Sequence, residues 1–254
     1  MSALLPFQLT GKLALITGGG TGLGLGIARA FVRAGARVVL TGRRADVLER
    51  ACAELGEAAT FRTNDLSELA TLPELVREVE STLGPLDILV NNAGINLKKF
   101  ALEVSDEDFQ RIQQTNVAGL FALTREVARG MVARQSGSII NITSMAALYG
   151  LSQVAPYSAS KSAVLGMSRV LASDLSPHGV RVNCIAPGFI DSPMLRQALD
   201  ADPARQQKVL GRTPLGRYGQ PADVGYAAVF LASDAAQFIT GVNLPVDGGN
   251  SIGF

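Results

Sequence analysis

The chain has 254 residues and a mass of 26.6 kDa, with 47% hydrophobic and 18% charged residues, so it can bury a large core and is not a disordered chain. Its 23 Lys and Arg residues against 22 Asp and Glu residues leave a formal charge of +1, which disfavours a nucleic-acid partner because nucleic-acid-binding domains carry a basic excess. A zinc site built on several histidines, or a Ser-His-Asp triad, would depend on the single histidine His178, and Cys52 and Cys184 form no zinc or disulfide pattern. We therefore expect no metal site.

Short apolar, β-branched segments alternate with segments of helical period along the chain. Strands are predicted at Leu13–Thr17, Val38–Thr41, Ala59–Arg62, Leu86–Val90, Ser138–Ile142, Val180–Ile185 and Val242–Val246. Helices are predicted near Leu23–Ala34, Ala45–Leu55, Glu68–Leu83, Asp106–Arg134, Tyr157–Leu175 and Ala222–Ala232. This alternation indicates right-handed βαβ units, hence an α/β protein with a doubly wound parallel sheet of the Rossmann type. Since no linker or repeat interrupts the pattern, we expect one three-layer domain over residues 1–254.

The sequence predicts a cytoplasmic protein without a membrane partner. Residues 1–10 do not have the layout of a signal peptide, and no apolar run approaches the roughly 18 residues that a membrane span requires. The mean hydropathy of +0.24 is high, but buried parallel strands account for it.

A glycine-rich turn follows the first predicted strand and opens the first predicted helix. Gly18, Thr21, Gly22, Leu23 and Gly24 lie in this turn. Glycines allow the backbone to approach a pyrophosphate, whose charge is favourable at a helix N-terminus. A purely structural loop is the alternative, but the position between first strand and first helix favours a dinucleotide site.

The end of the second strand indicates which dinucleotide binds. NAD requires an Asp or Glu there for the ribose hydroxyls, whereas this chain has Gly42, Arg43 and Arg44. Guanidinium groups suit a 2′-phosphate through charge-assisted bonds. We therefore favour NADP(H) over NAD(H); a solvated basic helix start is the alternative.

A candidate catalytic group lies near the start of the helix predicted at Tyr157–Leu175. Tyr157 and Lys161 are four residues apart and share one helix face, so the ammonium should lower the pKa of the phenol. Ser144 follows the strand that ends at Ile142, and its hydroxyl could donate to a carbonyl oxygen that gains charge.

Together these motifs resemble the short-chain dehydrogenase/reductase family, in its single-domain branch, over nearly the whole chain. The resemblance rests on Thr17-Gly18 through Gly24, Asn91-Asn92-Ala93-Gly94, Asn116, Ser144, Tyr157 with Lys161, Pro187-Gly188, and Val246-Asp247-Gly248-Gly249. It implies hydride transfer between a nicotinamide and a carbonyl or secondary alcohol.

The resemblance also implies a role for each site residue. Tyr157 would be the general acid or base, Lys161 would lower its pKa and bind the nicotinamide ribose, and Ser144 would polarise the carbonyl. Asn116 would hold a water that links Lys161 to solvent. The cofactor contacts implied beyond the first two strands are Asp65 (alternatively a helix cap), Asn92, Gly94, Tyr157, Lys161, Pro187, Gly188, Ile190 and Ser192.

The sequence does not identify the substrate. Specificity is expected from a mixed-charge lid of two short helices at about residues 189–219. The tail resembles the gluconate 5-dehydrogenase and 3-oxoacyl-carrier reductase subgroups, so a small polyol or sugar acid is favoured and a 3-oxoacyl thioester is the alternative. A non-catalytic dinucleotide sensor and a methyltransferase are further alternatives; the intact catalytic residues disfavour the first, and the lack of an acid after the second strand disfavours the second.

We also expect a homotetramer, or at least a dimer. The helices predicted at Asp106–Arg134 and from Tyr157 have more apolar and small positions than one sheet face can cover. Family members pair these helices across a two-fold axis, and closed symmetry is usual for such oligomers.

Overall fold

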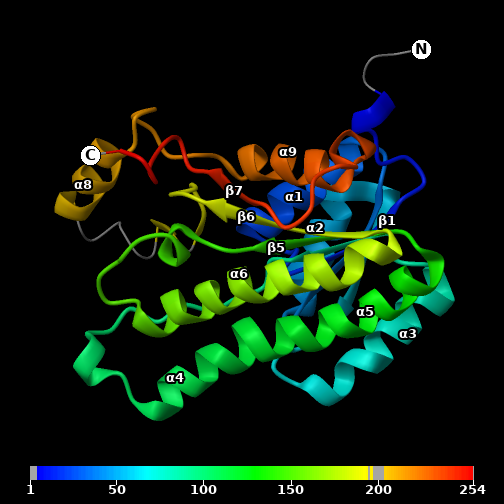
Figure 1. Ribbon diagram of the computed structural model, residues 1–254, viewed down its shortest axis with the longest axis horizontal. Coiled ribbons are helices and arrows are strands. Elements are labelled where there is room, and N and C mark those ends of the chain that lie inside the picture. Colours follow the sequence, from blue (N-terminus) through cyan, green and yellow to red (C-terminus); the bar gives the residue numbers. More distant parts are fainter. Residues whose placement is uncertain (1–4, 194, 197–202, 254) are drawn as a thin grey trace.

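The computed structural model describes residues 5–193, 195–196 and 203–253, and within these residues seven strands form one parallel sheet of order β3-β2-β1-β4-β5-β6-β7 (Figure 1). The strands are β1 (Leu13–Thr17), β2 (Arg37–Gly42), β3 (Ala59–Thr63), β4 (Ile88–Asn91), β5 (Gly137–Ile142), β6 (Val180–Pro187) and β7 (Asn243–Val246). The winding direction reverses between β1 and β4, and a parallel sheet forms its ligand crevice at such a point. The doubly wound α/β fold predicted from the sequence is confirmed.

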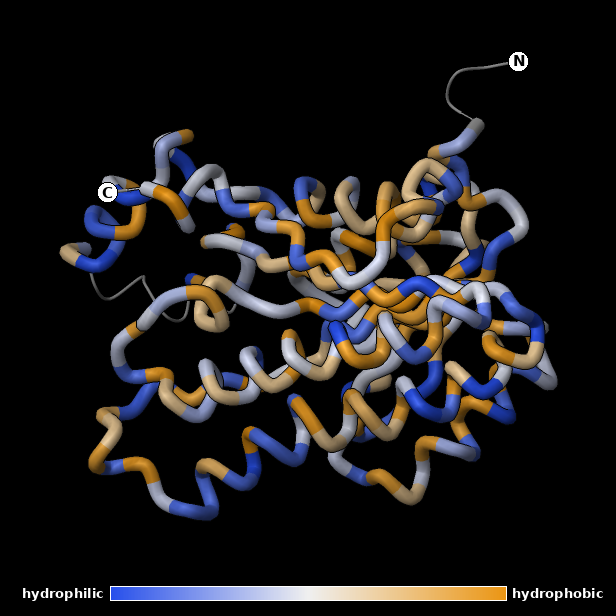
Figure 2. The backbone as a smooth tube through the Cα atoms, viewed as in Figure 1, coloured by the Kyte–Doolittle hydropathy of each residue, from blue (hydrophilic) through white to orange (hydrophobic). Residues whose placement is uncertain are grey.

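Helices cover both faces of the sheet. They are α1 (Gly22–Arg33), α2 (Ala45–Leu55), α3 (Leu72–Leu83), α4 (Asp106–Gln113), α5 (Leu120–Arg134), α6 (Ala155–Leu175), α8 (Pro203–Arg212) and α9 (Pro221–Ala232). Side chains of β1 alternate between the two faces: Ala14 and Ile16 pack with α1, α2 and α9, and Leu13 and Leu15 pack with α3 and α5. The apolar strands therefore lie between two cores, as the hydrophobic centre of the molecule in Figure 2 shows.

One predicted helix has a different structure. The segment Asp106–Arg134 is α4, then a π-helical turn at Gln114–Gly119, then α5. The turn adds a residue where Gly119 passes Leu66 so closely that a Cβ on Gly119 would lie 2.2 Å from the Leu66 carbonyl oxygen. Such π-turns occur often at functional sites, and this one contains Asn116.

The expected lid is described in part. Of its two short helices, α8 is present, whereas the other was expected in a stretch in which residues 194 and 197–202 lie outside the described part of the chain. Among the described residues, no helix is long and apolar enough to cross a membrane, and no group of three or more His, Cys, Asp or Glu residues could hold a metal ion.

Helices α1 and α9 cross at glycines. A Cβ on Gly26 of α1 would lie 2.4 Å from the Pro221 Cβ, and a Cβ on Gly225 of α9 would lie 2.8 Å from the Gly26 carbonyl oxygen. Contacts this short do not occur between real atoms, so the crossing requires glycine on both helices.

We expect Gly26→Ala to lower the free energy of unfolding by about 1–3 kcal/mol, because the added methyl overpacks the crossing. Gly211→Ala in α8 is the control, since a Cβ there meets nothing within 4 Å. Urea denaturation followed by circular dichroism measures both. A Gly26→Ala protein as stable as the wild type would contradict close packing of α1 on α9.

Candidate active site

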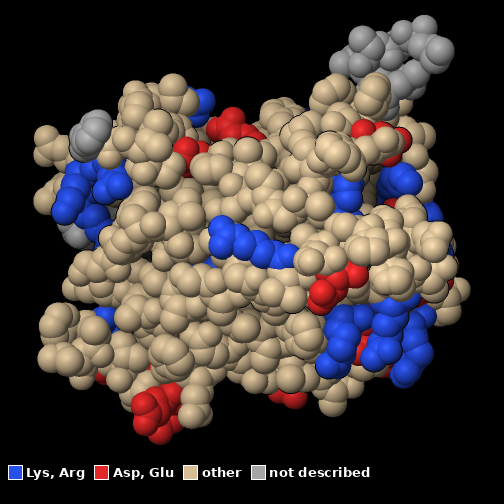
Figure 3. Space-filling model, viewed as in Figure 1, with Lys and Arg blue, Asp and Glu red and all other residues tan. Residues whose placement is uncertain are grey.

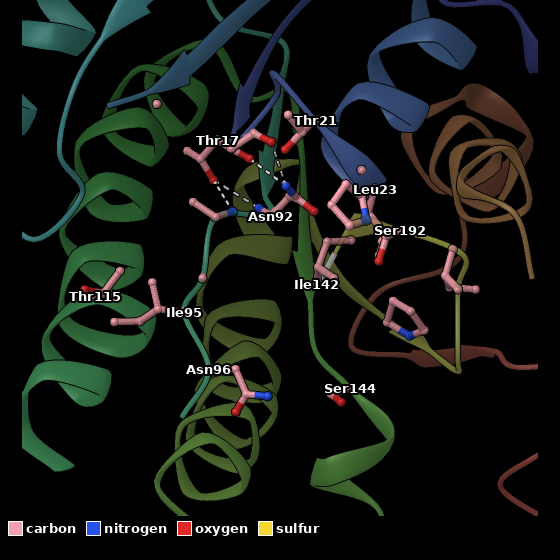
Figure 4. A pocket seen from close by; sticks show the side chains of 18 of the residues that line it. Thr17, Thr21, Leu23, Asn92, Ile95, Asn96, Thr115, Ile142, Ser144 and Ser192 are labelled. Atoms are coloured by element: carbon pink, nitrogen blue, oxygen red, sulfur yellow. Dashed lines mark hydrogen bonds between the residues drawn. The ribbon is translucent and has the colours of Figure 1, made fainter. Parts of the chain in front are cut away.

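A pocket of about 460 Å³ opens at the carboxyl ends of β1, β2, β4, β5 and β6 (Figure 4). It is lined by all the residues that the sequence analysis placed in the site except Gly24 and Asn116, both of which are buried. Residues from the two ends of the predicted site, such as Arg43 and Tyr157, therefore share one continuous cavity. The pocket also includes Leu151 and Val154, to which the sequence analysis gave no role in the site, and Arg205, which lies in the expected lid.

The glycine turn is shaped to let an anion approach the start of α1. Gly18 has a φ of +64°, which favours glycine. A Cβ on Gly24 would lie 2.2 Å from the Gly18 carbonyl oxygen, so the turn folds tightly on the first helical turn. Thr21 precedes α1 without a side-chain hydrogen bond to it, which leaves the N-terminal N–H groups of α1 to a ligand. This arrangement fits a pyrophosphate.

Thr17 and Asn92 join β1 to β4 at the floor of the pocket. The Thr17 hydroxyl accepts hydrogen bonds from the backbone N–H groups of Asn92 and Ala93, each at 3.0 Å. The Asn92 amide donates back to the carbonyl oxygens of Thr17, at 2.9 Å, and Gly18, at 3.2 Å (Figure 4). Asn92 lines the pocket as expected, but its amide N–H groups hold the glycine turn in place.

The end of β2 presents basic groups to the pocket. Arg43 is 69% exposed and lies 3.8 Å from the carboxylate of Asp65, which follows β3. Hydrogen bonds from the backbone and hydroxyl of Ser67, together with Arg43, hold the pKa of Asp65 below its ordinary value. Arg44 is the residue before α2 and also lines the pocket. The bonds to Ser67 show that Asp65 also caps the turn after β3.

Ser144, Tyr157 and Lys161 come together from β5 and α6. The Lys161 side chain is buried; its Nζ donates to the Ile142 carbonyl oxygen at 2.7 Å and lies 5.7 Å from the centre of the Tyr157 ring. Burial lowers the pKa of Lys161 to about 8. The Ser144 hydroxyl accepts from the backbone of Ala146 at 3.1 Å, which fixes it at the start of a 3₁₀ turn.

The pKa of Tyr157 differs from the sequence-based expectation. We expected Lys161 to lower it, whereas burial raises it, and a hydrogen bond with Ser144 only partly offsets this effect. The reason is that desolvation acts on the phenolate more strongly than a cation that is itself buried and bonded to Ile142. Burial therefore favours the protonated phenol of Tyr157.

Asn116 holds the loop after β4 against α6. Its side chain accepts from the Ile95 N–H at 2.9 Å and donates to the Ile95 carbonyl at 2.9 Å and to the Ser160 hydroxyl at 3.0 Å. A Cβ added to Gly94 would lie 3.3 Å from the Asn116 Oδ1 and 3.6 Å from the Lys161 Nζ. Gly94 therefore lies between the Asn116 and Lys161 side chains. The partner Ser160 could not be found from the sequence, because the pairing spans 44 residues.

The segment after β6 closes the remaining side of the pocket. Gly188 passes the tail so closely that a Cβ would lie 2.6 Å from the Asp247 Cα. Ile190 bridges to Gly219, and the Ser192 hydroxyl accepts from the Leu195 N–H at 3.3 Å. A Cβ on Gly22 would lie 3.7 Å from the Ser192 Cβ, so this segment lies beside the start of α1.

Comparison with known proteins agrees with this geometry. A family model described as enoyl-(acyl carrier protein) reductase matches residues 18–251. Galactitol 2-dehydrogenase (L-tagatose-forming) of Cereibacter sphaeroides is 41% identical over 249 residues, 97% of each chain. The 2-dehydro-3-deoxy-D-gluconate 5-dehydrogenase of Dickeya dadantii is 39% identical over 246 residues, 96% of each chain. The crystal structure of a gluconate 5-dehydrogenase from Burkholderia cenocepacia, in complex with NADP and tartrate, is 38% identical with a TM-score of 0.95 and covers 100% of both chains. The chain therefore belongs to the short-chain dehydrogenase/reductase family and is a dinucleotide-dependent oxidoreductase of secondary alcohol and carbonyl groups.

Proposed function

We propose that this protein is an NADP(H)-dependent oxidoreductase of a small polyhydroxylated substrate, a polyol or a sugar acid. The observation that carries the proposal is the convergence of Ser144, Tyr157 and Lys161 on the cavity that Arg43 and the start of α1 also line. The similar proteins named above include dehydrogenases of galactitol and of gluconate, which supports this substrate class. Segment 189–219, which contains α8, would act as the substrate lid.

The chemistry is the interconversion of a secondary alcohol plus NADP⁺ with a carbonyl, NADPH and a proton. The dinucleotide, when bound, supplies or accepts the hydride. In carbonyl reduction, Tyr157 Oη donates the proton to the carbonyl oxygen, and in alcohol oxidation it takes the proton back. Ser144 donates a hydrogen bond to the same oxygen as negative charge develops there. Lys161 stabilises the phenolate that remains and binds the nicotinamide ribose, and Asn116 supports the water path to Lys161.

Two alternatives are weaker. A 3-oxoacyl-carrier reductase needs a basic surface for its acidic partner, but Arg134 donates to the Leu86 carbonyl at 2.8 Å and lies 3.5 Å from Glu80. The other two cations of α5, Arg125 and Arg129, both pair with Glu126, at 3.0 and 3.3 Å. A sensor without turnover would have no need of Ser144, Tyr157 and Lys161 in one cavity.

The preference for NADP(H) rests on the end of β2. No carboxylate follows β2 at Gly42, and the exposed Arg43 lies where a 2′-phosphate could be bound by its guanidinium.

We expect Arg43→Ala to raise the KM for NADPH about 10-fold or more with little change for NADH, because a charge-assisted bond to the 2′-phosphate is lost. Arg50→Ala is the matched control, since Arg50 is similarly exposed (71% against 69%) but pairs with Asp46 on α2. Initial rates with both dinucleotides test this, and Gly42→Asp should favour NADH. Equal kcat/KM values for NADPH and NADH in the wild type would rule out the preference.

The proton donor can be tested by removing one oxygen. Tyr157→Phe keeps the packed ring, so we expect NADPH binding near the wild-type value and a loss of kcat of about 10²–10⁴-fold. The wild-type rate of carbonyl reduction should fall as pH rises through about 8, because Lys161 then loses the charge that stabilises the phenolate. Stopped-flow NADPH oxidation between pH 6 and 10 measures both effects. Full activity in Tyr157→Phe would show that the Tyr157 hydroxyl is not the proton donor.

We propose a homotetramer, in which two surfaces of each subunit meet copies of themselves. One surface contains the exposed Phe109, Phe121 and Val170 on α4, α5 and α6, and the other contains Tyr226, Phe238 and Val242 around α9 and β7. A tetramer of closed two-fold symmetry needs two such self-complementary surfaces. The protein is proposed to be cytoplasmic, which agrees with the free thiols of Cys52 and Cys184.

Light scattering at micromolar concentration should give about four times the chain mass of 26.6 kDa. Phe238→Asp should leave dimers, because it places a charge in one of the two interfaces. Ala53→Asp is the control, because Ala53 is exposed on α2, which packs on β3 at the sheet edge opposite β7, so the tetramer should stay intact. A wild-type mass of one chain would contradict the proposal.

A further inference from the structure

The charge of the pocket is distributed unevenly. Besides Arg43 and Arg44 at the end of β2, its charged lining groups among the described residues are Asp65, Lys161 and Arg205. Asp65 lies with Arg43 after the strands that bind the far end of a dinucleotide. The reacting end, near Ser144 and Tyr157, therefore has two cationic side chains and no carboxylate from the described lining. This end attracts an anion.

Helix α8 brings Arg205 to that end. Its sequence, Pro203–Arg212, contains three cations and no acidic residue, and Figure 3 shows Lys and Arg side chains gathered over it. Arg205 is half-buried and lies one helical turn before the buried Val209, so both are on the inner face, whereas Lys208 is exposed. Figure 1 places α8 at the same end of the molecule as the start of α6, where Tyr157 lies.

The C-terminal end of α8 is fixed to two other parts of the chain. The Arg212 guanidinium lies 4.2 Å from the centre of the Tyr149 ring, and its Nε donates to the Asn250 carbonyl oxygen at 3.0 Å. The Asn250 amide donates to the Thr213 hydroxyl at 2.9 Å. Tyr149 belongs to the loop after Ser144, and Asn250 to the tail. These contacts hold α8, and with it Arg205, in register with the loop that contains Ser144.

We propose that Arg205 binds the carboxylate of the substrate, so that the enzyme acts on a sugar acid in preference to the neutral polyol of the same chain length. This rests on the proposed function and defines its substrate class. A guanidinium has five N–H donors in a planar fork that matches a carboxylate, so Arg205 can bind one while it keeps a contact within the protein. Asn96, which also lines the pocket, adds a polar group that can bond to substrate hydroxyls.

The test uses ligand pairs that differ only in the charged group: D-gluconate with D-glucitol, and D-galactonate with D-galactitol. For oxidation with NADP⁺ at fixed ionic strength, we expect Arg205→Gln to raise the KM for the acids about 10- to 100-fold and to leave the KM for the alditols within about 2-fold. The KM of Arg205→Lys for the acids should lie between those of the wild type and Arg205→Gln, because lysine keeps the charge but lacks the planar guanidinium. Lys208→Gln, an exposed cation on the same helix, should behave as the wild type.

Binding separates this inference from the proposed reaction. Titration calorimetry of the same compounds into the Tyr157→Phe enzyme loaded with NADP⁺ should show tighter binding of each acid than of its alditol. This difference should disappear in the Tyr157→Phe, Arg205→Gln double variant. If the wild type oxidises none of the compounds but this binding pattern is found, the inference holds and the proposed reaction is wrong. If Arg205→Gln weakens acids and alditols equally, or changes neither, the inference is overturned. Unchanged thermal midpoints and NADPH affinities in the Arg205 variants exclude misfolding as the cause.

Discussion

The hydrogen bonds between Thr17 and Asn92 are the contacts on which the rest of the site depends. A doubly wound sheet opens a crevice where its winding direction reverses, and here that point lies between β1 and β4. The two strands would be free to separate beyond their last pair of residues, but the Thr17 hydroxyl and the Asn92 amide tie their continuations together with bonds of 2.9–3.2 Å. The glycine turn on one side and the Asn116 loop on the other are both positioned by this floor. A rigid floor matters because hydride transfer requires the reacting groups to be held in place before reaction.

The burial of Lys161 costs stability, but it also lowers the pKa of the ammonium. A buried ammonium is costly, and a hydrogen bond from Lys161 Nζ to the Ile142 carbonyl oxygen at 2.7 Å offsets part of this cost. Other buried polar groups on β4, β5, α5 and α6 bond to one another: Asn91 donates to Thr124 and Asn141, and Asn141 donates to Ser168. With a pKa of about 8, the Lys161 ammonium is mainly charged at neutral pH and loses its proton at slightly alkaline pH. The same burial keeps Tyr157 protonated in this structure, so one desolvated environment serves both groups.

Local patterns in the sequence were sufficient for the sheet, the glycine turn and the spacing of Tyr157 and Lys161, because each is set within a few residues. Contacts across the fold were not predictable. The hydroxyl of Thr17 acts on residues 75 and 76 positions away, and Ser160 was overlooked as the partner of Asn116. The π-turn at Gln114–Gly119 joins α4 to α5 without a break in the helical chain, so the sequence indicated one uninterrupted helix. The pKa of Tyr157 was predicted in the wrong direction because a neighbouring charge can be read from spacing, whereas desolvation requires the fold.

The two halves of the pocket are held by different kinds of structure, and this explains how one fold can take different substrates. The dinucleotide half is built from strand ends whose glycines tolerate no added atom, as the 2.2 Å approach at Gly24 shows. The half that we propose to bind the substrate is completed by α8, which is attached to the rest of the domain through Arg212, Tyr149 and the tail and has one buried side chain, Val209. A side chain on its inner face can change without disturbing the sheet. Galactitol and gluconate dehydrogenases are both about 40% identical to this chain over nearly its whole length. Under our proposal, the charge of Arg205 would distinguish a sugar acid from a polyol in such a fold, while the residues proposed to move the proton stay the same.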